Sequence, residues 1–324
     1  MKKLSIALAL AGILLATALV AYSGVANVGR AVLSAGWGGF ATICGWQFVI
    51  FQPLALAWDQ IGRARGIRRP IAFIWARMVR DASGNCLPFS QVGGFFFGAR
   101  ALIMQGITWP KATASTIVDV TAEFLSELAF VAMGLSIVLV RVPKADTIAV
   151  PVEIGLGLAL CALIVFVWVQ RDAAPLFARI AGRIAGKRLH GAQRRLAIVQ
   201  VEMAGIYRHT GRLAASFALH LLGWLLAGLG DWIAFHAIGV PIDLDAALAI
   251  EALVSAIAAA AFIVPVMAGV QEASYAGLGA IFGVPADMSL AVSLIRRARD
   301  VVVGIPILLV WQFLEVRRIH AAPS

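Results

Sequence analysis

The segment AFIVPVMAGVQEASY, residues 261–275, interrupts a long apolar stretch whose composition otherwise favours helix. Pro265 removes a backbone hydrogen-bond donor, and Gly269 tolerates the backbone conformations that follow such a break. In a membrane, a broken helix persists only where protein covers it or a water-filled cavity touches it. We therefore expect residues 246–283 to form a hairpin of two half-helices, with Glu272 facing a cavity rather than lipid.

The composition of the chain is typical of a membrane protein. Of its 324 residues, 61% are hydrophobic and only 14% are charged, whereas soluble domains are about 45–50% apolar. The 27 lysines and arginines outnumber the 17 acidic residues, but they cluster between apolar stretches, which favours anionic lipid headgroups over nucleic acid as partners. Cys44, Cys86 and Cys161 are far apart and have no histidine nearby, so no metal site, disulfide framework or cofactor is expected.

Six apolar segments are long enough to cross a bilayer as helices, which takes about 20 residues. They are residues 4–22, 40–58, 111–140, 151–170, 213–238 and 288–314. The loop at 59–70 carries four arginines, so the positive-inside rule places it, and with it both chain termini, in the cytoplasm of a bacterial inner-membrane protein. A cleaved signal peptide is the alternative for residues 4–22, but their apolar run exceeds the ~7–15 residues of such a signal.

A second interrupted stretch occupies residues 71–107. We expect half-helices at 71–79 and 95–107, separated by a break at 83–94 that is rich in glycine and contains a proline. This pattern predicts a re-entrant hairpin that enters from the cytoplasmic side, whereas the hairpin at 246–283 enters from outside. The candidate gating residues are Pro88, Gly93 and Gly94 in the first hairpin and Pro265 and Gly269 in the second.

The longest polar segment, residues 171–212, holds nine basic residues. Its apolar residues recur at helical spacing, which predicts a pair of amphipathic helices on the anionic headgroups of the inner leaflet. A solvated cytoplasmic linker is the alternative for the middle of this segment.

The order of the predicted segments repeats along the chain. Span, span, hairpin and span occur in residues 1–140 and again in 141–315, and a cytoplasmic tail follows at 316–324. An offset of 177 residues carries Pro88 onto Pro265. We therefore expect an inverted repeat, the architecture of carriers that alternate access to one site, although such symmetry also survives in proteins that transport nothing.

Charged residues cluster on two of the predicted spans. The first cluster is Asp119, Glu123 and Glu127, and the second is Arg296, Arg297, Arg299 and Asp300. The members of the first cluster are four residues apart and share one helix face, while Arg296 and Asp300 have the spacing of an ion pair. Because each such charge costs about 2.5–3.5 kcal/mol at the centre of a spanning helix, both clusters are expected to face the interior. We predict that they pair across the pseudo-twofold axis and line a polar crevice, with a purely structural salt-bridge network as the alternative.

Three other polar features have two interpretations each. Asp231 with His220 and His236 is a candidate proton relay, although histidines at helix ends more often bond to backbone or headgroups. Arg100 either holds a lipid phosphate or extends to the cytoplasmic surface. Glu251 faces its hairpin partner or lies at the outer interface.

Two motifs resemble the signatures of a known membrane family. They are NCLPFSQVGG, residues 85–94, followed by Arg100, and PVMAGVQE, residues 265–272, followed by Gly283 and Arg297. Both resemble the transmembrane (flippase) region of the lysylphosphatidylglycerol synthases and of their stand-alone relatives, over roughly residues 4–314. Together with RRAR at 296–299, they are most similar to the hopanoid-biosynthesis-associated (HpnL-type) group.

The resemblance implies a protein that handles or translocates lipid, serving hopanoids. Members of the family often carry a glutamate after the first glycine pair, where this chain has Phe95, so no acidic role is transferred to that position. The sequence shows no soluble aminoacyl-transfer domain, so transfer of lysine to lipid is not expected.

These patterns lead to one main hypothesis and two alternatives. The main hypothesis is an inner-membrane lipid transporter or flippase for a hopanoid or an anionic phospholipid; no metalloprotease, serine-hydrolase or phosphate-loop motif suggests an enzyme. The alternatives are an enzyme that modifies a lipid head with Asp119, Glu123 or Glu272 as acid or base, and a scaffold that holds lipid-biosynthesis enzymes through residues 171–212. The candidate translocation residues are Glu272, Arg297, Arg296, Asp300, Asp119, Glu123 and Arg100.

Overall fold

The structure, a computed structural model, describes residues 25–87, 90–141, 190–260 and 269–321, together with the isolated positions 157 and 161. Within these ranges every regular element is an α-helix, as the composition predicted. The helices are α2 (Val25–Arg63), α3 (Pro70–Cys86), α4 (Ser90–Met104), α5 (Trp109–Arg141), α8 (His190–Tyr207), α9 (Thr210–Ala237), α10 (Leu244–Ala260), α11 (Val270–Ile281) and α12 (Ala286–Ala321). The predicted spans at 4–22 and 151–170 lie outside the described residues.

Three helices in the described part of the chain are long and apolar enough to cross a membrane. They are Leu33–Arg63 within α2, Trp109–Arg141 (α5) and Thr210–Ala237 (α9). Helix α12 is 36 residues long, but its charged residues, among them Arg296 and Arg297, keep it outside this group. The chain is therefore a membrane protein, whereas the total of six spans stays a prediction.

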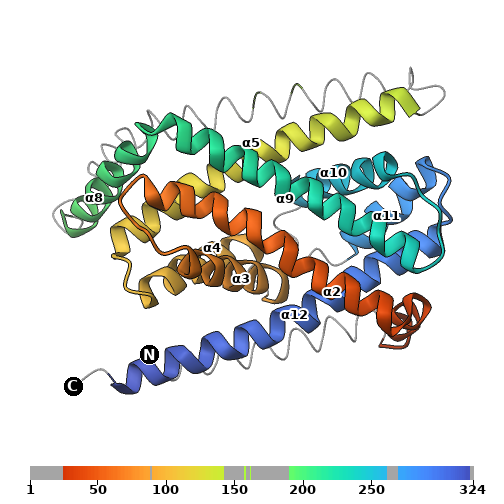
Figure 1. Ribbon diagram of the computed structural model, residues 1–324, viewed down its shortest axis with the longest axis horizontal. Helices are drawn as coiled ribbons and strands as arrows, with labels where there is room; N and C mark the ends of the chain where they lie inside the picture. Colours follow the sequence, from red (N-terminus) through yellow and green to blue (C-terminus); the bar gives the residue numbers. More distant parts are fainter. Residues whose placement is uncertain are drawn as a thin grey trace.

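The long helices form an antiparallel bundle with a short hairpin at each end (Figure 1). Helices α2 and α9 pack against each other along the middle, while α5 and α12 lie on opposite sides of them. Helices α2 and α12 run in one direction, and α5 and α9 run in the other (Figure 1). The α3–α4 hairpin lies at the end of the bundle where α2 and α12 finish, and the α10–α11 hairpin lies at the opposite end.

The contacts between helices occur in matching pairs. Helix α3 of the first hairpin packs against α12, just as α10 of the second hairpin packs against α5. In the same way α2 contacts α12 while α9 contacts α5, and α4 contacts α5 while α11 contacts α12. The offset of 177 residues also carries the start of α5 onto the start of α12, from Trp109 to Ala286. The same set of helix contacts thus occurs twice in one chain.

The break in the first hairpin is shorter than expected. Helices α3 and α4 both continue into the predicted break at 83–94, which leaves only residues 87–89 between them. The reason lies in Gly94, which serves packing instead of interrupting the helix. A Cβ at Gly94 would lie 2.7 Å from the backbone oxygen of Arg80, so glycine lets α4 approach α3 closely. Pro88, which disfavours helix at the residue before it, lies outside the described residues.

The second predicted hairpin contains two short helices, and its entry into the membrane stays a prediction. Helix α10 ends at Ala260 and α11 begins at Val270, while residues 261–268, with Pro265, lie outside the described ranges. Gly269 has a φ of 78°, a conformation that favours glycine. Its N–H donates a 3.0 Å hydrogen bond to the Glu272 carboxylate, which caps the start of α11.

Helix α8 is the described part of the basic segment at 171–212. It packs against α5 and buries Val199 and Ile206, while Leu196 and Val201 on its other side are exposed. Glu202 accepts a hydrogen bond from Arg65 at 2.5 Å, which ties α8 to the turn after α2. The first helix of the predicted amphipathic pair lies outside the described residues.

Candidate functional site

The first of two buried charge networks joins the first hairpin to α5. Arg77 and Arg80, one turn apart on α3, face the acidic side of α5. Arg80 donates to Asp119 at 2.7 Å and also to Glu123. Arg77 donates to Glu123 at 2.6 Å and to Asp81 at 2.9 Å. Because both arginines and Asp119 are buried, these charges are compensated almost entirely by one another.

Two further side chains complete this first network. His220 of α9 lies with its Nε2 3.0 Å from Asp119 Oδ1, so the network connects three helices. The Phe95 ring of α4 lies 4.5 Å from the Arg80 guanidinium, which is a cation–π contact.

The second network joins four helices around Arg296 of α12. Arg296 donates to Asp231 of α9 at 2.5 Å and to Glu251 of α10 at 3.0 Å. The hydroxyl of Tyr275 on α11 donates to Asp231 at 2.6 Å and also lies close to Arg296. Asp231, Glu251 and Tyr275 are buried, so the second hairpin is bound to α9 and α12 by charged hydrogen bonds.

A third ion pair, the gate pair, lies where the second hairpin resumes after its break. The Arg297 Nε donates to Glu272 at 2.9 Å, Nη2 of Arg297 lies 2.7 Å from the same carboxylate oxygen, and Arg297 is only 5% exposed. The other oxygen of Glu272 accepts the Gly269 N–H. The Glu272 carboxylate therefore serves two donors, one at the start of α11 and one on α12.

The predicted pairing of the two clusters across the axis is wrong. Asp119 and Glu123 pair with arginines of α3, while Arg296 pairs with acids of α9 and α10. The two clusters lie on α5 and α12, and each of these helices packs against a hairpin rather than against the other. The charges therefore pair with partners other than the opposite cluster. The spacing of Arg296 and Asp300 also misleads, since Asp300 instead accepts from its neighbour Arg299 at 2.7 Å.

The proton relay is also wrong, because its three members have separate partners. Asp231 pairs with Arg296, His220 contacts Asp119, and the ring Nδ1 of His236 lies 2.9 Å from the Trp232 carbonyl.

Arg100 and Glu251 both have protein partners in the structure. Arg100 donates to Glu315 of α12 at 2.5 Å, so its guanidinium connects α4 to α12. Glu251 faces its hairpin partner, the first of the two interpretations, because it contacts Tyr275 of α11.

Sequence reasoning missed four residues of the networks, namely Arg77, Arg80, Asp81 and Tyr275. The two arginines are three residues apart in an otherwise apolar stretch, which is the spacing of one helix face and a usable signal. The expected half-helix at 71–79 ended before Arg80, and the pair was therefore not recognised.

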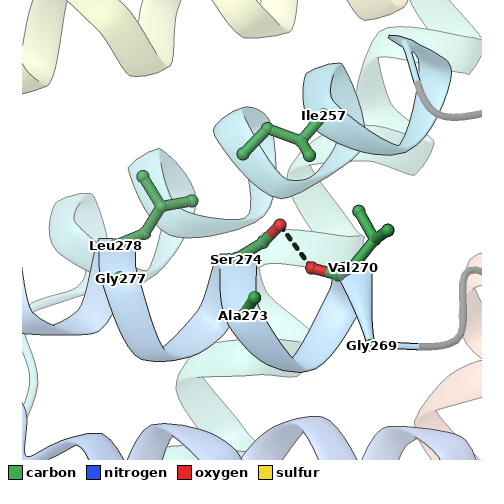
Figure 2. A pocket seen from close by; sticks show the side chains of 7 residues that line it. All are labelled: Ile257, Gly269, Val270, Ala273, Ser274, Gly277 and Leu278. Carbon is green, nitrogen blue, oxygen red and sulfur yellow. Dashed lines mark hydrogen bonds between the residues drawn. The ribbon is translucent and has the colours of Figure 1, made fainter.

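An open apolar groove lies between α10 and α11 (Figure 2). Its volume is about 560 Å³, and its lining comprises Ile257 of α10 and Gly269, Val270, Ala273, Ser274, Gly277 and Leu278. The Ser274 hydroxyl donates to the Val270 carbonyl at 2.7 Å, so its proton is already engaged (Figure 2). Gly269 belongs both to this groove and to the cap made by Glu272, so the groove begins beside the gate pair.

Comparison with known proteins identifies the family. A family model described as "Lysylphosphatidylglycerol synthase TM region" matches residues 6–307. No match was found among curated proteins or among solved structures. The matched range contains both motifs, at 85–94 and 265–272, and covers most of the sequence. The chain therefore belongs to the lysylphosphatidylglycerol synthase transmembrane-region family.

Proposed function

We propose that this protein moves a lipid between the two leaflets of a bacterial inner membrane. The family and the spanning helices support a membrane function related to lipid. The two hairpins would act as gates at opposite faces of the membrane, with the α3–α4 hairpin on the cytoplasmic side. The HpnL-type resemblance favours a hopanoid as the lipid, and the mechanism leaves that lipid chemically unchanged.

The matched helix contacts support an inverted repeat. Helices α5 and α12 run in opposite directions, and so do α2 and α9. Helix α5 packs against α10 of the second hairpin, and α12 packs against α3 of the first hairpin. Broken helices related by a twofold axis in the membrane plane are typical of carriers that open first to one side and then to the other.

The gate pair beside the apolar groove is the observation that carries the proposal. A lipid has a charged or polar head and an apolar body, and this region offers a buried guanidinium on one side of α11 and an apolar groove on the other. A phosphate or other anionic head can take the place of Glu272 on Arg297, because guanidinium binds phosphate and carboxylate in the same forked geometry. Freed from Arg297, Glu272 no longer fixes α11 against α12, so binding of the head would loosen the second hairpin.

Lipid translocation by purified protein in liposomes tests this function. The probe is a fluorescent phosphatidylglycerol whose outer-leaflet pool is quenched by dithionite, and hopanoid-containing liposomes form a second series. We expect Arg297→Ala to reduce the translocation rate at least about tenfold, since it removes the group that holds the head. Glu272→Gln should also alter the rate, because it weakens both hydrogen bonds of the gate pair.

An exposed arginine on the same helix provides the matched control. Arg317 lies near the end of α12 and stacks on Phe313, so Arg317→Ala should leave the rate unchanged. Wild-type rates in both Arg297→Ala and Glu272→Gln would remove the gate pair from the mechanism. Mass spectrometry of the recovered lipid separates transport from catalysis, because a chemically altered headgroup would instead make the protein an enzyme.

A further inference from the structure

Three hydrogen-bonding side chains on α9 have a buried atom without a partner among the described residues. They are Ser216, His220 and Trp224, here called the α9 row, and they share one helix face because they are four residues apart. The atoms are Ser216 Oγ, His220 Nδ1 and Trp224 Nε1. Ser216 and His220 are both 0% exposed. Buried polar groups of folded proteins are nearly always hydrogen-bonded, so three such atoms in one row need an explanation.

Comparable side chains of this chain do make the missing bonds. Serines inside helices commonly donate to a carbonyl of their own helix, as Ser126 of α5 does at 2.7 Å, whereas Ser216 does not. The Trp46 indole of α2 donates to the Leu226 carbonyl at 2.8 Å, whereas the Trp224 indole meets no acceptor in the described part of the chain. Ser216 and Trp224 therefore each keep a donor that is free for another partner.

The third member of the row adds an acceptor. His220 Nε2 lies 3.0 Å from Asp119 Oδ1, and the other oxygen of Asp119 accepts from Arg80. Because this carboxylate can only accept, Nε2 carries the hydrogen, and Nδ1 of the neutral ring is an acceptor. The α9 row thus combines donors with an acceptor, which suits groups that both donate and accept, such as water and the hydroxyls of a lipid head.

The α9 row lies in the interface between α9 and α5. His220 contacts Asp119 of α5, and the Trp224 ring stacks on Phe130 of α5 with the ring centroids 6.0 Å apart. Both helices are long and apolar enough to cross a membrane. The unpartnered atoms therefore lie between two spanning helices.

The same face of α9 connects the two charge networks. The row includes His220 of the first network, and Asp231 of the second network follows Trp224 by two helical turns. The helix rises about 22 Å from Ser216 to Asp231, which is most of the ~30 Å thickness of the hydrocarbon. Polar side chains thus follow one face of α9 across most of a membrane.

We propose that α5 and α9 part along the α9 row during transport, and that the head of the lipid crosses the membrane on this row. The proposal rests on the proposed lipid transport, and it specifies a hydroxyl-bearing head. In the closed interface the three atoms have given up water without gaining a partner, which lowers stability. Opening returns hydrogen bonds to them, first from water and then from the head. The atoms that weaken the closed interface therefore favour the open one.

The first test compares stability with transport. Ser216→Ala removes an unpartnered hydroxyl, so it should raise the melting temperature by about 2 °C or more. Trp224→Phe removes the indole N–H and keeps an aromatic ring beside Phe130. Because the head loses a hydrogen-bonding partner in each variant, we expect both to reduce translocation of fluorescent phosphatidylglycerol at least about fivefold. Unchanged translocation in both variants would overturn the proposal.

The matched controls make the same substitutions where the polar atom is bonded. Ser126→Ala and Trp46→Phe each remove a hydrogen bond that the structure contains, so each should melt at a lower temperature than its counterpart on the α9 row. Both should transport within about twofold of the wild-type rate. A fivefold loss of transport in the controls as well would show that the effect is general, and it would overturn the assignment of the row.

The second test measures opening of the interface without transport. The three native cysteines are replaced by serine, and Ser216→Cys is exposed in phosphatidylglycerol nanodiscs to trimethylammonium-ethyl methanethiosulfonate. This charged reagent reaches only thiols that contact water. We expect Ser216→Cys to react at least about tenfold faster than Ala234→Cys, because only the α9 row opens. Ala234 is an equally buried control on the same helix, in an apolar cluster.

The outcomes separate this proposal from the proposed transport. Equally slow reaction at positions 216 and 234 in a protein that translocates lipid would overturn the path, while lipid transport stands. Fast reaction of Ser216→Cys without translocation of any lipid would overturn the proposed transport and the passage of a head, while opening of the interface stands.

Discussion

Arg80 is the residue on which the first network depends most. It binds Asp119 and Glu123 together, and all three lie away from water or nearly so. Removal of one partner from a buried ion pair costs more stability than the intact pair contributes. The reason is that the remaining charge then has neither water nor a counter-charge. The same reasoning applies to Arg296, which separates Asp231 from Glu251.

We predict that Arg80→Ala lowers the free energy of unfolding by about 3–5 kcal/mol, since it leaves two buried carboxylates uncompensated. The measurement is denaturant unfolding in detergent, followed by tryptophan fluorescence. Addition of Glu123→Gln to Arg80→Ala should recover part of the loss, because it removes one of the two charges.

The control for this prediction is Arg141→Ala. Arg141 also pairs with two acids, Asp243 and Asp245, but Arg141 and Asp243 are exposed and Asp245 is half-buried, and ion pairs in contact with water contribute little to stability. A similar loss of stability in both arginine variants would show that burial does not determine the contribution of Arg80.

At the residue scale, the sequence predicted which charged side chains face the interior of the protein better than it predicted their partners. The spacing of Asp119 and Glu123 placed them on one inward face, and Glu272 was predicted at a break. Their partners were beyond reach, because pairing depends on how far each helix slides and rotates against its neighbour. Spacing within one segment carries no information about that packing.

At the element scale, the first hairpin touches α12 through small side chains. Cys86 near the end of α3 packs against Gly304, and its thiol lies 3.4 Å from the Asp300 carbonyl. Such close contact between helices is what small residues permit in membranes. The sequence predicted both hairpins from a proline and glycines between apolar stretches, but it overestimated the first break, because Gly94 serves helix packing instead.

If the first hairpin moves during transport, a covalent link to α12 will stop it. In a variant with Cys44→Ser, Cys161→Ser and Gly304→Cys, the new thiol lies beside Cys86, so mild oxidation should form a disulfide between α3 and α12. We expect oxidation to reduce lipid translocation at least about tenfold and dithiothreitol to restore it.

The reduced form of the same variant and Gly304→Ala control for crowding in this contact. Full transport by a protein shown to be cross-linked would mean that α3 and α12 remain together throughout the cycle, and the first hairpin would then not be a gate.

At the scale of the whole molecule, the two halves share their contacts but reverse their charges. The offset of 177 residues carries Asp119 onto Arg296, an acidic residue onto a basic one. In the first half the long helix provides the acids and the hairpin provides the arginines, while in the second half the long helix provides the arginine and the hairpin provides Glu251. Each hairpin therefore has its matching charges on the long helix of its own half, and exchange of partners between the halves would place like charges together.

The proposed inverted repeat predicts which loops face which side of the membrane. The turn between α2 and α3, the start of α5 and the end of α12 lie at one end of the bundle together with α8, and the loop between α9 and α10 lies at the other (Figure 1). Arg68 in the first loop and Pro241 in the second are both exposed. With the native cysteines replaced, a cysteine at position 241 should react with a membrane-impermeant maleimide in spheroplasts, since that loop has no basic residue to retain it in the cytoplasm. A cysteine at position 68 should react only after the membrane is permeabilised. Because an even number of crossings between the two loops would put both on one side, labelling of both positions from outside would contradict the inverted repeat, and the proposal of gates at opposite faces would fail with it.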